Sequence, residues 1–416
     1  MTQSLLIGVP TIRPAGRGTR VSALVGGIEA WFESDELPLQ PSPEAFASAF
    51  LIPAAAEGRQ LELEAPICPV WRSGAADLLP VIGGWWGYRS EVPDGVRRVA
   101  AGPALDGKTA LCFSGGVDAF YSLLRYPGVD LLVAAHGFDI PRAETRRMAA
   151  FERSLREVAQ ALGIRAGVIR TNLREHPHFA GVSWERTHGG ALAALGHLLS
   201  DSVSRLVISS SAARRDEHPW GSHWQTDPLW SSSRMAVEHF GEAVRRGDKL
   251  IEIADHPLVQ QHLRVCWENA NADVNCSRCE KCIRTELILA ACGKHDDFPV
   301  FQPGATLARR VDGIAKVPET PLLIPYRAAL QSGLDPAVAR AVRALLRRSR
   351  RAQMRRRVRG LVGVLRRSLI PPRASAPAVT TASAAAPTAV TGTAASPAPA
   401  SPVTATPSRS LNLVQS

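Results

Sequence analysis

Short apolar runs alternate with amphipathic stretches along the chain from Lys108 to Ser210. The apolar runs predict strands over residues 109–113, 130–135, 165–170 and 205–210. The stretches between them predict helices that end near Arg125 and that cover residues 143–162 and 184–200. This alternation predicts an α/β fold with a doubly wound parallel sheet and helices on both faces. Ligands of such folds bind in the loops that follow the carboxyl ends of the strands.

Residues 1–105 show a different pattern. Residues 21–25 and 61–64 are typical of strands, and residues 42–51 predict a helix with Ser42 as its N-cap and Pro43 at its first position. We interpret this segment as a small α+β domain without an assigned role. Residues 106–300 are then the main α/β domain.

The segments after the fourth predicted strand are less regular. Residues 212–233 are rich in Trp and His and predict a long loop that covers a substrate, with a second metal site at His218, His223 and Asp227 as a weaker alternative. A helix is expected over residues 282–292, ended by Gly293. We expect a connecting segment at 301–335, an arginine-rich helix at 336–370, and a disordered Ala/Pro/Ser/Thr tail at 371–416.

The charge of the chain is unevenly distributed. The net charge is +11, but residues 336–416 contain 14 of the 49 Lys and Arg residues and none of the 38 acidic ones. Residues 1–335 therefore carry 35 basic and 38 acidic side chains. This near-neutral body disfavours a protein that wraps nucleic acid over its whole surface. The hydrophobic content of 45% disfavours a wholly disordered chain.

The segment Ser114, Gly115, Gly116, Val117 and Asp118 follows the first strand of the predicted sheet. Its two glycines allow a tight turn that brings backbone N–H groups to a bound anion, and the next helix directs its positive end at the same point. Asp118 is expected to hold a cation that accompanies phosphates. The alternative is a tight turn in which glycine serves packing alone.

Four cysteines fall within 17 positions: Cys266, Cys276, Cys279 and Cys282. Two close Cys-x2-Cys steps and one distant cysteine are typical of a closed, tetrahedral structural zinc site. An iron–sulfur cluster and free or redox-active cysteines are the alternatives. Together with the lack of a signal-peptide pattern and of a long apolar run, this cysteine usage predicts a cytoplasmic protein.

The sequence from Phe113 to Asp118 resembles the SGGxDS signature of the PP-loop ATP pyrophosphatase superfamily. With the cysteine cluster, the motif pattern is similar to that of the 7-cyano-7-deazaguanine synthase family. The resemblance covers about residues 108–295 and implies an adenine nucleotide alpha hydrolase-like fold. It departs from the signature at Ala119, where the family has Ser, and Ser122 lies one helical turn further on.

The resemblance implies an ATP-dependent ligase that forms AMP and pyrophosphate. ATP and Mg²⁺ would lie on residues 114–118, with Ser114 and Asp118 in catalytic roles, and Zn²⁺ on the four cysteines. A small-molecule carboxylate or carbonyl would be adenylated and then attacked by ammonia or an amine, forming a C–N bond. The alternatives are sulfur transfer to tRNA or a small molecule, and a non-catalytic nucleotide-binding module.

Three further residues belong to this hypothesis. His136 follows the second strand and is expected either to contact the nucleotide or to cap the strand end. Lys281 and Arg284 flank the cysteines and are expected to neutralise the leaving pyrophosphate, with solvated helix charges as the alternative.

The arginine-rich segment has apolar residues at near-helical spacing, among them Val338, Val342, Leu345 and Leu361. A basic amphipathic helix of this kind is attracted to RNA, to an acidic protein or to a membrane surface. We expect the residues after Gly333 to be dispensable for folding, and a homodimer is a further expected partner state.

Overall fold

The computed structural model describes residues 4–95, 107–216, 218–268, 274–301, 304–317 and 323–369, and leaves the side chains of residues 94, 95, 357 and 359–369 undescribed. Contacts divide the chain into a compact unit, residues 1–359, and a second unit, residues 360–416. The predicted disordered tail at 371–416 lies outside the described residues. Among the described helices, none is long and apolar enough to span a membrane.

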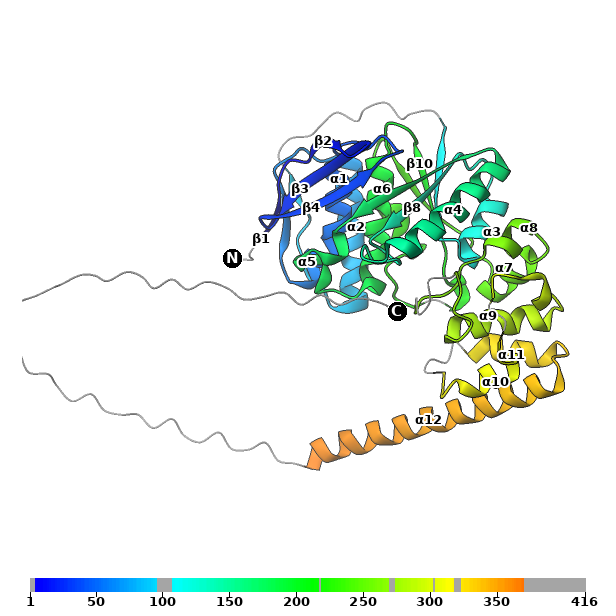
Figure 1. The fold of residues 1–416 in the computed structure, drawn as a ribbon. Coiled ribbons are helices and arrows are strands. Elements are labelled where there is room, and N and C mark those ends of the chain that lie inside the picture. The colour runs from blue at the N-terminus through cyan, green and yellow to red at the C-terminus, as the bar shows by residue number, and fades with distance from the viewer. Residues whose placement is uncertain are drawn as a thin grey trace, which may run out of the picture. The chain divides into compact units, whose positions relative to one another are not determined.

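The centre of the fold is one mixed sheet with the order β11-β10-β7-β8-β9-β4-β3-β1-β5-β6, and β2 pairs with β3 (Figure 1). Strands β11 to β9 in this order are mutually parallel. The strands are β1 Ser4–Ile7, β2 Thr11–Ala15, β3 Gly18–Val25, β4 Ile28–Ser34, β5 Gln60–Leu63, β6 Asp94–Gly95, β7 Thr109–Cys112, β8 Leu131–His136, β9 Arg165–Thr171, β10 Arg205–Ser209 and β11 Ala236–Phe240. The predicted α/β class with a mostly parallel sheet is confirmed.

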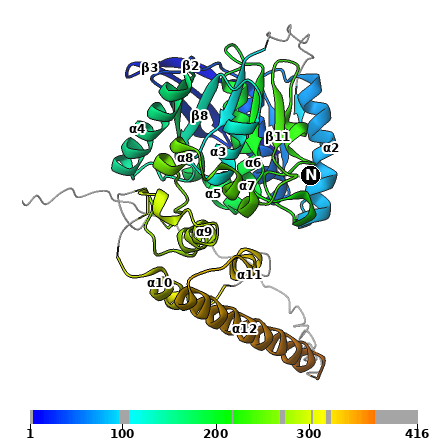
Figure 2. The same cartoon turned by 90° about the vertical axis from the view of Figure 1, so that its right-hand side faces the viewer.

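Helices cover both faces of this sheet, and the last three helices of the chain lie away from it (Figures 1 and 2). The helices are α1 Pro43–Ala56, α2 Pro69–Trp86, α3 Val117–Arg125, α4 Thr145–Leu162, α5 Pro177–Ala180, α6 Trp184–Leu198, α7 Arg246–Ile253, α8 Pro257–His262, α9 Glu280–Ala291, α10 Leu307–Gly313, α11 Leu323–Gln331 and α12 Pro336–Leu369. In β10, Leu206 and Ile208 pack with α1, α2 and α6, whereas Val207 packs with α3, α4, α7 and α8. Alternate side chains of a strand point to opposite faces, so both faces are buried.

The N-terminal segment is not a separate domain, contrary to the expectation for residues 1–105. Strand β4 pairs antiparallel with β9 through Phe32 and Thr171, so the N-terminal strands extend the main sheet. Helices α1 and α6 share one apolar core. The local predictions are confirmed: Ser42 caps α1 by accepting a hydrogen bond from the backbone N–H of Ala45, and Pro43 is its first residue.

The segment after residue 300 contributes to the folded core. This corrects the expectation that residues 301–335 only connect the main domain to the arginine-rich helix. Helices α9 to α12 share a third apolar core, in which Val342 and Leu345 of α12 are fully buried. The hydroxyl of Ser349, also fully buried, accepts a hydrogen bond from the backbone N–H of Val317 at 2.9 Å. The first half of α12 therefore belongs to the folded unit, whereas Met354 and Val358 further along are exposed.

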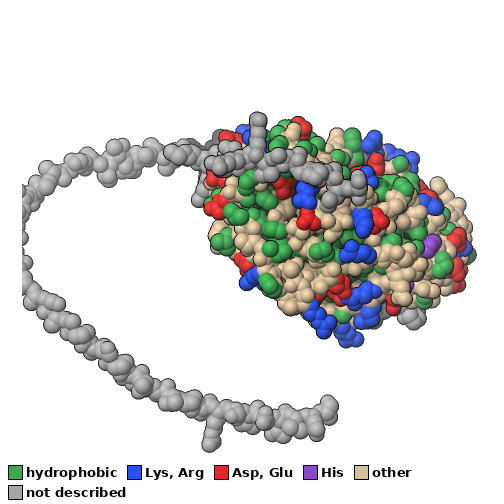
Figure 3. Space-filling model, turned by 90° about the horizontal axis from the view of Figure 1, so that it is seen from above, with side chains coloured by type: hydrophobic (Ala, Val, Ile, Leu, Met, Phe, Trp, Pro, Cys, Tyr) green, Lys and Arg blue, Asp and Glu red, His purple; other side chains and the backbone are tan. Residues whose placement is uncertain are grey.

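Charged side chains of both signs are interspersed over the face shown in Figure 3. Hydrophobic side chains lie between them instead of forming one continuous patch on that face. This distribution is the one expected for a near-neutral folded body.

Candidate anion site and cysteine metal site

The loop of residues 114–118 lies at the point where the winding of the sheet reverses. From β7 the chain continues to β8 and β9 on one side, and then crosses to β10 and β11 on the other. The loop directly follows the carboxyl end of β7 and leads into α3. Crevices at such reversal points are the usual ligand sites of open α/β sheets.

The backbone of this loop presents N–H groups rather than side chains. Gly115 has a φ of 71°, which favours glycine, and Gly116 is the N-cap of α3 without a side-chain cap. Ser114 is exposed, and its hydroxyl accepts a hydrogen bond of 3.4 Å from the N–H of Gly116. The first N–H groups of a helix have no partner within it. The α3 N-terminus therefore offers donors and a positive dipole end to an anion.

Asp118, in the first turn of α3, is engaged by two cations of α7. Its Oδ2 accepts hydrogen bonds from Arg246 Nε at 2.7 Å and lies 2.6 Å from Arg246 Nη2. Its Oδ1 lies 3.3 Å from Lys249 Nζ, which also donates to the carbonyl oxygen of Ser210 at 2.7 Å. Asp118 therefore ties α7 and the end of β10 to the start of α3.

Electrostatics keep this carboxylate charged. Burial alone would raise the pKa of Asp118, but Arg246 and Lys249 outweigh it, so the pKa lies below its ordinary value. Burial lowers the pKa of Lys249, and Asp118 opposes that effect. Burial and the nearby Arg246 lower the pKa of Lys281 to about 8.

More cations surround the loop. Lys281 of α9 lies within electrostatic reach of Asp118, Asp139 and Arg246. Arg284, one turn further on α9, lies 3.6 Å from Glu280. Arg264 is largely enclosed by protein, and its guanidinium lies 5.7 Å from the ring centre of Phe151. The structure thus brings Lys281 within electrostatic reach of Asp118, and Arg284 within reach of Arg246.

Asp118 does not fit the predicted role of a Mg²⁺ ligand. Mg²⁺ requires oxygen ligands with free lone pairs in near-octahedral geometry, but both oxygens of Asp118 face side-chain cations. Among the described residues, only the four cysteines form a group of three or more potential metal ligands.

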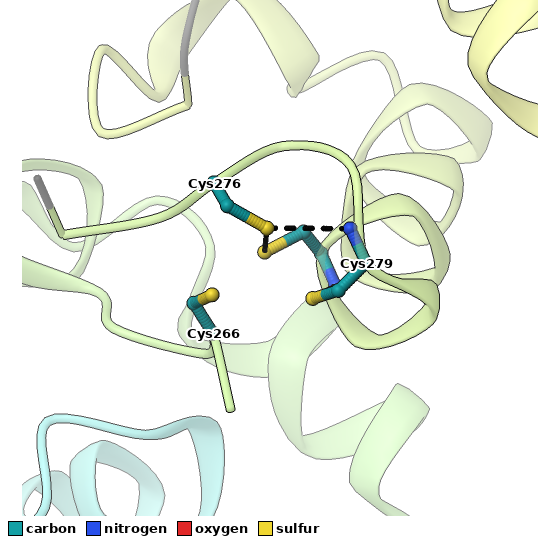
Figure 4. Close-up of side chains that lie close together, drawn as sticks. Cys266, Cys276 and Cys279 are labelled. Carbon is teal, nitrogen blue, oxygen red and sulfur yellow. Dashed lines mark hydrogen bonds between the residues drawn. The ribbon is translucent and has the colours of Figure 1, made fainter. Parts of the chain in front are cut away.

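The four cysteines fit a metal ion. Their sulfur atoms lie within 4.8 Å of one another, and all four residues are buried. The Sγ atoms of Cys276 and Cys282 are 3.9 Å apart, close to the separation of about 3.8 Å that four Zn–S bonds of about 2.3 Å require. In Figure 4 the sulfurs of Cys266, Cys276 and Cys279 point toward one common space. Zn²⁺ bound there would cross-link the segment around Cys266 to the start of α9.

The cysteine site is physically joined to the loop at residue 115. The backbone N–H of Arg264 donates to the carbonyl oxygen of Gly115 at 2.8 Å. Asn275 is fully buried and binds the same segment, residues 263–265. Its Oδ1 accepts a hydrogen bond from Val265 N at 2.8 Å, and its Nδ2 donates to Leu263 O at 2.8 Å. The chain segment that leads to Cys266 is therefore hydrogen-bonded both to the anion loop and to Asn275.

The surroundings of His136 and Ser122 are defined in the structure. His136 is buried, and its Nε2 lies 3.1 Å from the carbonyl oxygen of Pro141, so its contact in the structure is the strand-end one. Ser122 is fully buried in α3, and its hydroxyl has no hydrogen-bond partner among the described residues. Ser122 therefore does not replace the hydroxyl that is absent at Ala119.

Hydrogen bonds hold the Trp- and His-rich loop in place, and its described residues form no second metal site. Asp227, fully buried, accepts hydrogen bonds from Ser222 Oγ at 2.6 Å and from the N–H of His223 at 3.1 Å, and lies 2.7 Å from His239 Nδ1. Gly221 donates to Glu185 O at 2.7 Å, which fixes the loop to α6. Glu217 lies outside the described residues.

Sequence reasoning missed Arg246, Lys249 and Arg264. Arg246 is 128 positions from Asp118, and its segment carries no motif. The only local signal is the spacing of Arg246 and Lys249, which places both on one face of a helix. Which element this face meets is decided by the fold alone.

Comparisons with protein-family models, with curated proteins and with solved structures return no match to this chain.

Proposed function

We propose that the protein is an ATP-dependent adenylating enzyme of the PP-loop type, with an adenine nucleotide alpha hydrolase-like fold. It would form AMP and pyrophosphate while activating a carboxylate or carbonyl for attack by ammonia or an amine. The observation that carries the proposal is an uncapped α3 N-terminus at the reversal point of the sheet, surrounded by side-chain cations from α7 and α9. The resemblance of residues 113–118 to the PP-loop signature supports the same reaction class.

The proposed chemistry assigns each group a physical task. An oxygen of the substrate attacks the α-phosphorus of ATP, and the bond from this phosphorus to the bridging oxygen breaks with its electron pair leaving on pyrophosphate. Negative charge then accumulates on the leaving group. Donors fixed in advance around that charge stabilise the transition state more than the ground state. In this proposal the N–H groups at the start of α3 and the ammonium of Lys281 supply these donors.

The substrate oxygen and the nucleophile would meet beside the fixed wall formed by residues 218–230. This wall and the anion loop both lie at the carboxyl ends of the parallel strands, after β10 and β7 respectively. The wall carries the partly exposed rings of Trp220 and Trp224. Rings of this kind exclude water from an activated intermediate, which hydrolysis would otherwise consume.

The identity of the nucleotide product tests the proposal. Purified protein is incubated with ATP labelled at the α-phosphate, with ammonium and with a metabolite extract, and the products are separated. We expect AMP and pyrophosphate, and mass spectrometry of the extract identifies the metabolite consumed. ADP and phosphate as products would contradict the proposal, because cleavage would then occur at the γ-phosphorus.

A further inference from the structure

Helix α12 carries apolar residues on two opposite faces. Val338, Val342 and Leu345 lie on the face that packs against α9 to α11. Met354 and Val358 follow Val338 by 16 and 20 positions, which is about 4.4 and 5.6 turns at 3.6 residues per turn. They therefore lie on the face opposite to the buried one, and their side chains are 66% and 55% exposed. This outward apolar face is not a continuation of the third apolar core.

Arginines border the outward apolar residues. Arg351 and Arg355 line the same surface depression as Met354 and Val358, and both arginines are exposed. Residues 336–416 contain 14 Arg and no Lys, Asp or Glu, so no acidic side chain of this part of the chain offsets their charge. The outward face of α12 therefore combines apolar side chains with charge of one sign.

The same spacing continues further along the sequence. Leu361 and Leu365 follow Val358 by three and seven positions, and α12 extends to Leu369. Spacings of three, four and seven positions place residues on one side of a helix. An apolar stripe with arginines at its borders is typical of a helix that lies in the interface of a membrane.

We propose that α12 binds to a membrane surface that contains anionic lipid. Met354 and Val358 would enter the boundary between headgroups and acyl chains, and Arg351 and Arg355 would pair with lipid phosphates at the same depth. The helix would lie on the membrane without spanning it. This binding does not depend on the nucleotide chemistry proposed above.

Other partners match only part of this surface. RNA would neutralise the arginines but leave the apolar side chains in water. A second copy of α12 would cover the apolar side chains but bring rows of arginine together. A groove in an acidic protein has walls beside the bound helix, whereas α12 is already packed at the fully buried Ser349 and partly covered at Gln353. A flat anionic surface needs only the outward face.

Co-sedimentation of the full chain with lipid vesicles tests the proposal. One preparation is phosphatidylcholine alone, and the other contains about one third phosphatidylglycerol, which is anionic. The bound fraction is measured against lipid concentration at low and at physiological salt. We expect at least tenfold tighter binding to the anionic vesicles, with an affinity that falls as salt screens the charges.

Two double variants separate the apolar and the charged contributions. Met354→Ser with Val358→Ser removes the apolar side chains without changing the charge, and we expect it to weaken binding to anionic vesicles at least tenfold. Arg351→Gln with Arg355→Gln keeps the apolar side chains, and we expect weaker binding with a smaller dependence on salt. The Tm of both variants should equal that of the wild type, because all four side chains are exposed.

Val70→Ser with Leu162→Ser is the matched control. These two apolar side chains are 48% and 38% exposed on other helices, α2 and α4. The control therefore tests whether any loss of exposed apolar surface weakens binding. We expect it to bind anionic vesicles as the wild type does, and an effect as large as that of Met354→Ser with Val358→Ser would contradict the proposal.

Three further outcomes would overturn the proposal. The first is wild-type protein that does not bind anionic vesicles or binds both preparations equally. The second is tighter binding to polyuridylic acid than to anionic vesicles, retained by Met354→Ser with Val358→Ser, which would identify an RNA site. The third is a dimer in size-exclusion chromatography that the same double variant dissociates, which would identify a second copy of the chain as the partner. None of these outcomes bears on the nucleotide product, which tests the proposed function.

Discussion

Gly115 determines the local geometry of the anion loop. Its φ of 71° is one that side-chain-bearing residues adopt at a cost of roughly 1–2 kcal/mol. A Cβ at this position would lie 3.3 Å from Phe151 Cε2 and 3.4 Å from Arg264 Cβ. A side chain at this position would therefore strain the backbone and crowd Phe151 and Arg264.

We expect Gly115→Val to abolish ATP binding while the protein still folds. The branched side chain would displace Arg264 or the loop itself and move the N–H groups away from the phosphates. Fluorescence or calorimetric titration with ATP measures the effect. Gly128→Val is the control, because Gly128 has a φ of 73° and no atom within 4 Å of an added Cβ. Unchanged ATP affinity in Gly115→Val would refute the assignment of this loop.

His295 belongs to a buried charge cluster on α9 and α10. Glu286 is fully buried and accepts hydrogen bonds from Arg310 at 2.6 and 2.5 Å, and Nε2 of His295 lies 3.1 Å from Glu286 Oε2. The hydrogen bond with Glu286 raises the pKa of His295 above its ordinary value of 6.5. Arg310 also donates to Ser277 O at 2.9 Å, so this cluster supports the cysteine loop.

We expect His295→Gln to lower the Tm most at acidic pH. Because the folded-state pKa is raised, the stabilisation is complete below the unfolded pKa of about 6.5 and is lost as pH rises through the folded pKa. The Tm difference between wild type and variant should therefore be largest below about pH 6.5 and shrink as the pH rises above that value. Thermal melts in buffers of equal ionic strength measure it. A difference independent of pH would show that the charge of His295 does not contribute.

At the scale of elements, helix α9 begins inside the cysteine cluster. Cys279 is its N-cap, and its Sγ accepts a hydrogen bond of 3.4 Å from the N–H of Cys282. The same helix carries Lys281 within reach of Asp118 and packs Ile283 and Leu287 against α10 to α12. One helix start therefore links the metal site, the cations and the third apolar core.

We expect one zinc ion per chain and its loss in Cys279→Ser, because four thiolates hold Zn²⁺ far better than three with a hydroxyl. The Tm should fall by several degrees, and ATP binding should weaken through the bond between Arg264 and Gly115. Metal analysis, thermal melts and ATP titration measure these effects. Cys292→Ser, outside the cluster, is the control. Iron with visible absorbance in the wild type would refute zinc.

For the whole molecule, the C-terminal limit of the folded unit lies within α12. Val338, Val342 and Leu345 are buried against α9 and α11, and burial of each such side chain contributes about 1.5–3 kcal/mol. Stability therefore depends on the first half of this basic helix. The expectation that all residues after Gly333 are dispensable does not agree with this packing.

We expect truncation after Arg359 to leave the Tm unchanged, because that residue ends the compact unit. Truncation after Gly333 should lower the Tm strongly or cause aggregation, because it exposes Ile283, Leu287 and Tyr326. Thermal melts and size-exclusion chromatography of both truncated chains measure the difference. Equal melting temperatures for the two would show that α12 adds nothing to the fold.

The sequence alone predicts those features that depend on neighbouring residues. The N-cap of α1 depends on Ser42 and Pro43, the cysteine cluster on a spacing of 17 positions, and the parallel strands on apolar runs between amphipathic helices. The conformation of Gly115 is also local, since a glycine pair between strand and helix is required by the tight turn. Each of these signals lies within a short segment of the chain, so it can be recognised without knowledge of the fold.

Only the tertiary structure decides which elements meet. Asn172 accepts a hydrogen bond from the N–H of Trp31, 141 positions away, and so helps β9 to pair with β4 and to join the N-terminal strands to the main sheet. Arg246 contacts Asp118, 128 positions away in the sequence. The carboxylate that was expected to bind Mg²⁺ therefore pairs with side-chain cations instead. An apolar stripe or a charged face of a helix indicates that another element packs against it. It does not indicate which element, because many surfaces of the chain satisfy the same local pattern. The packing of the whole chain selects among them.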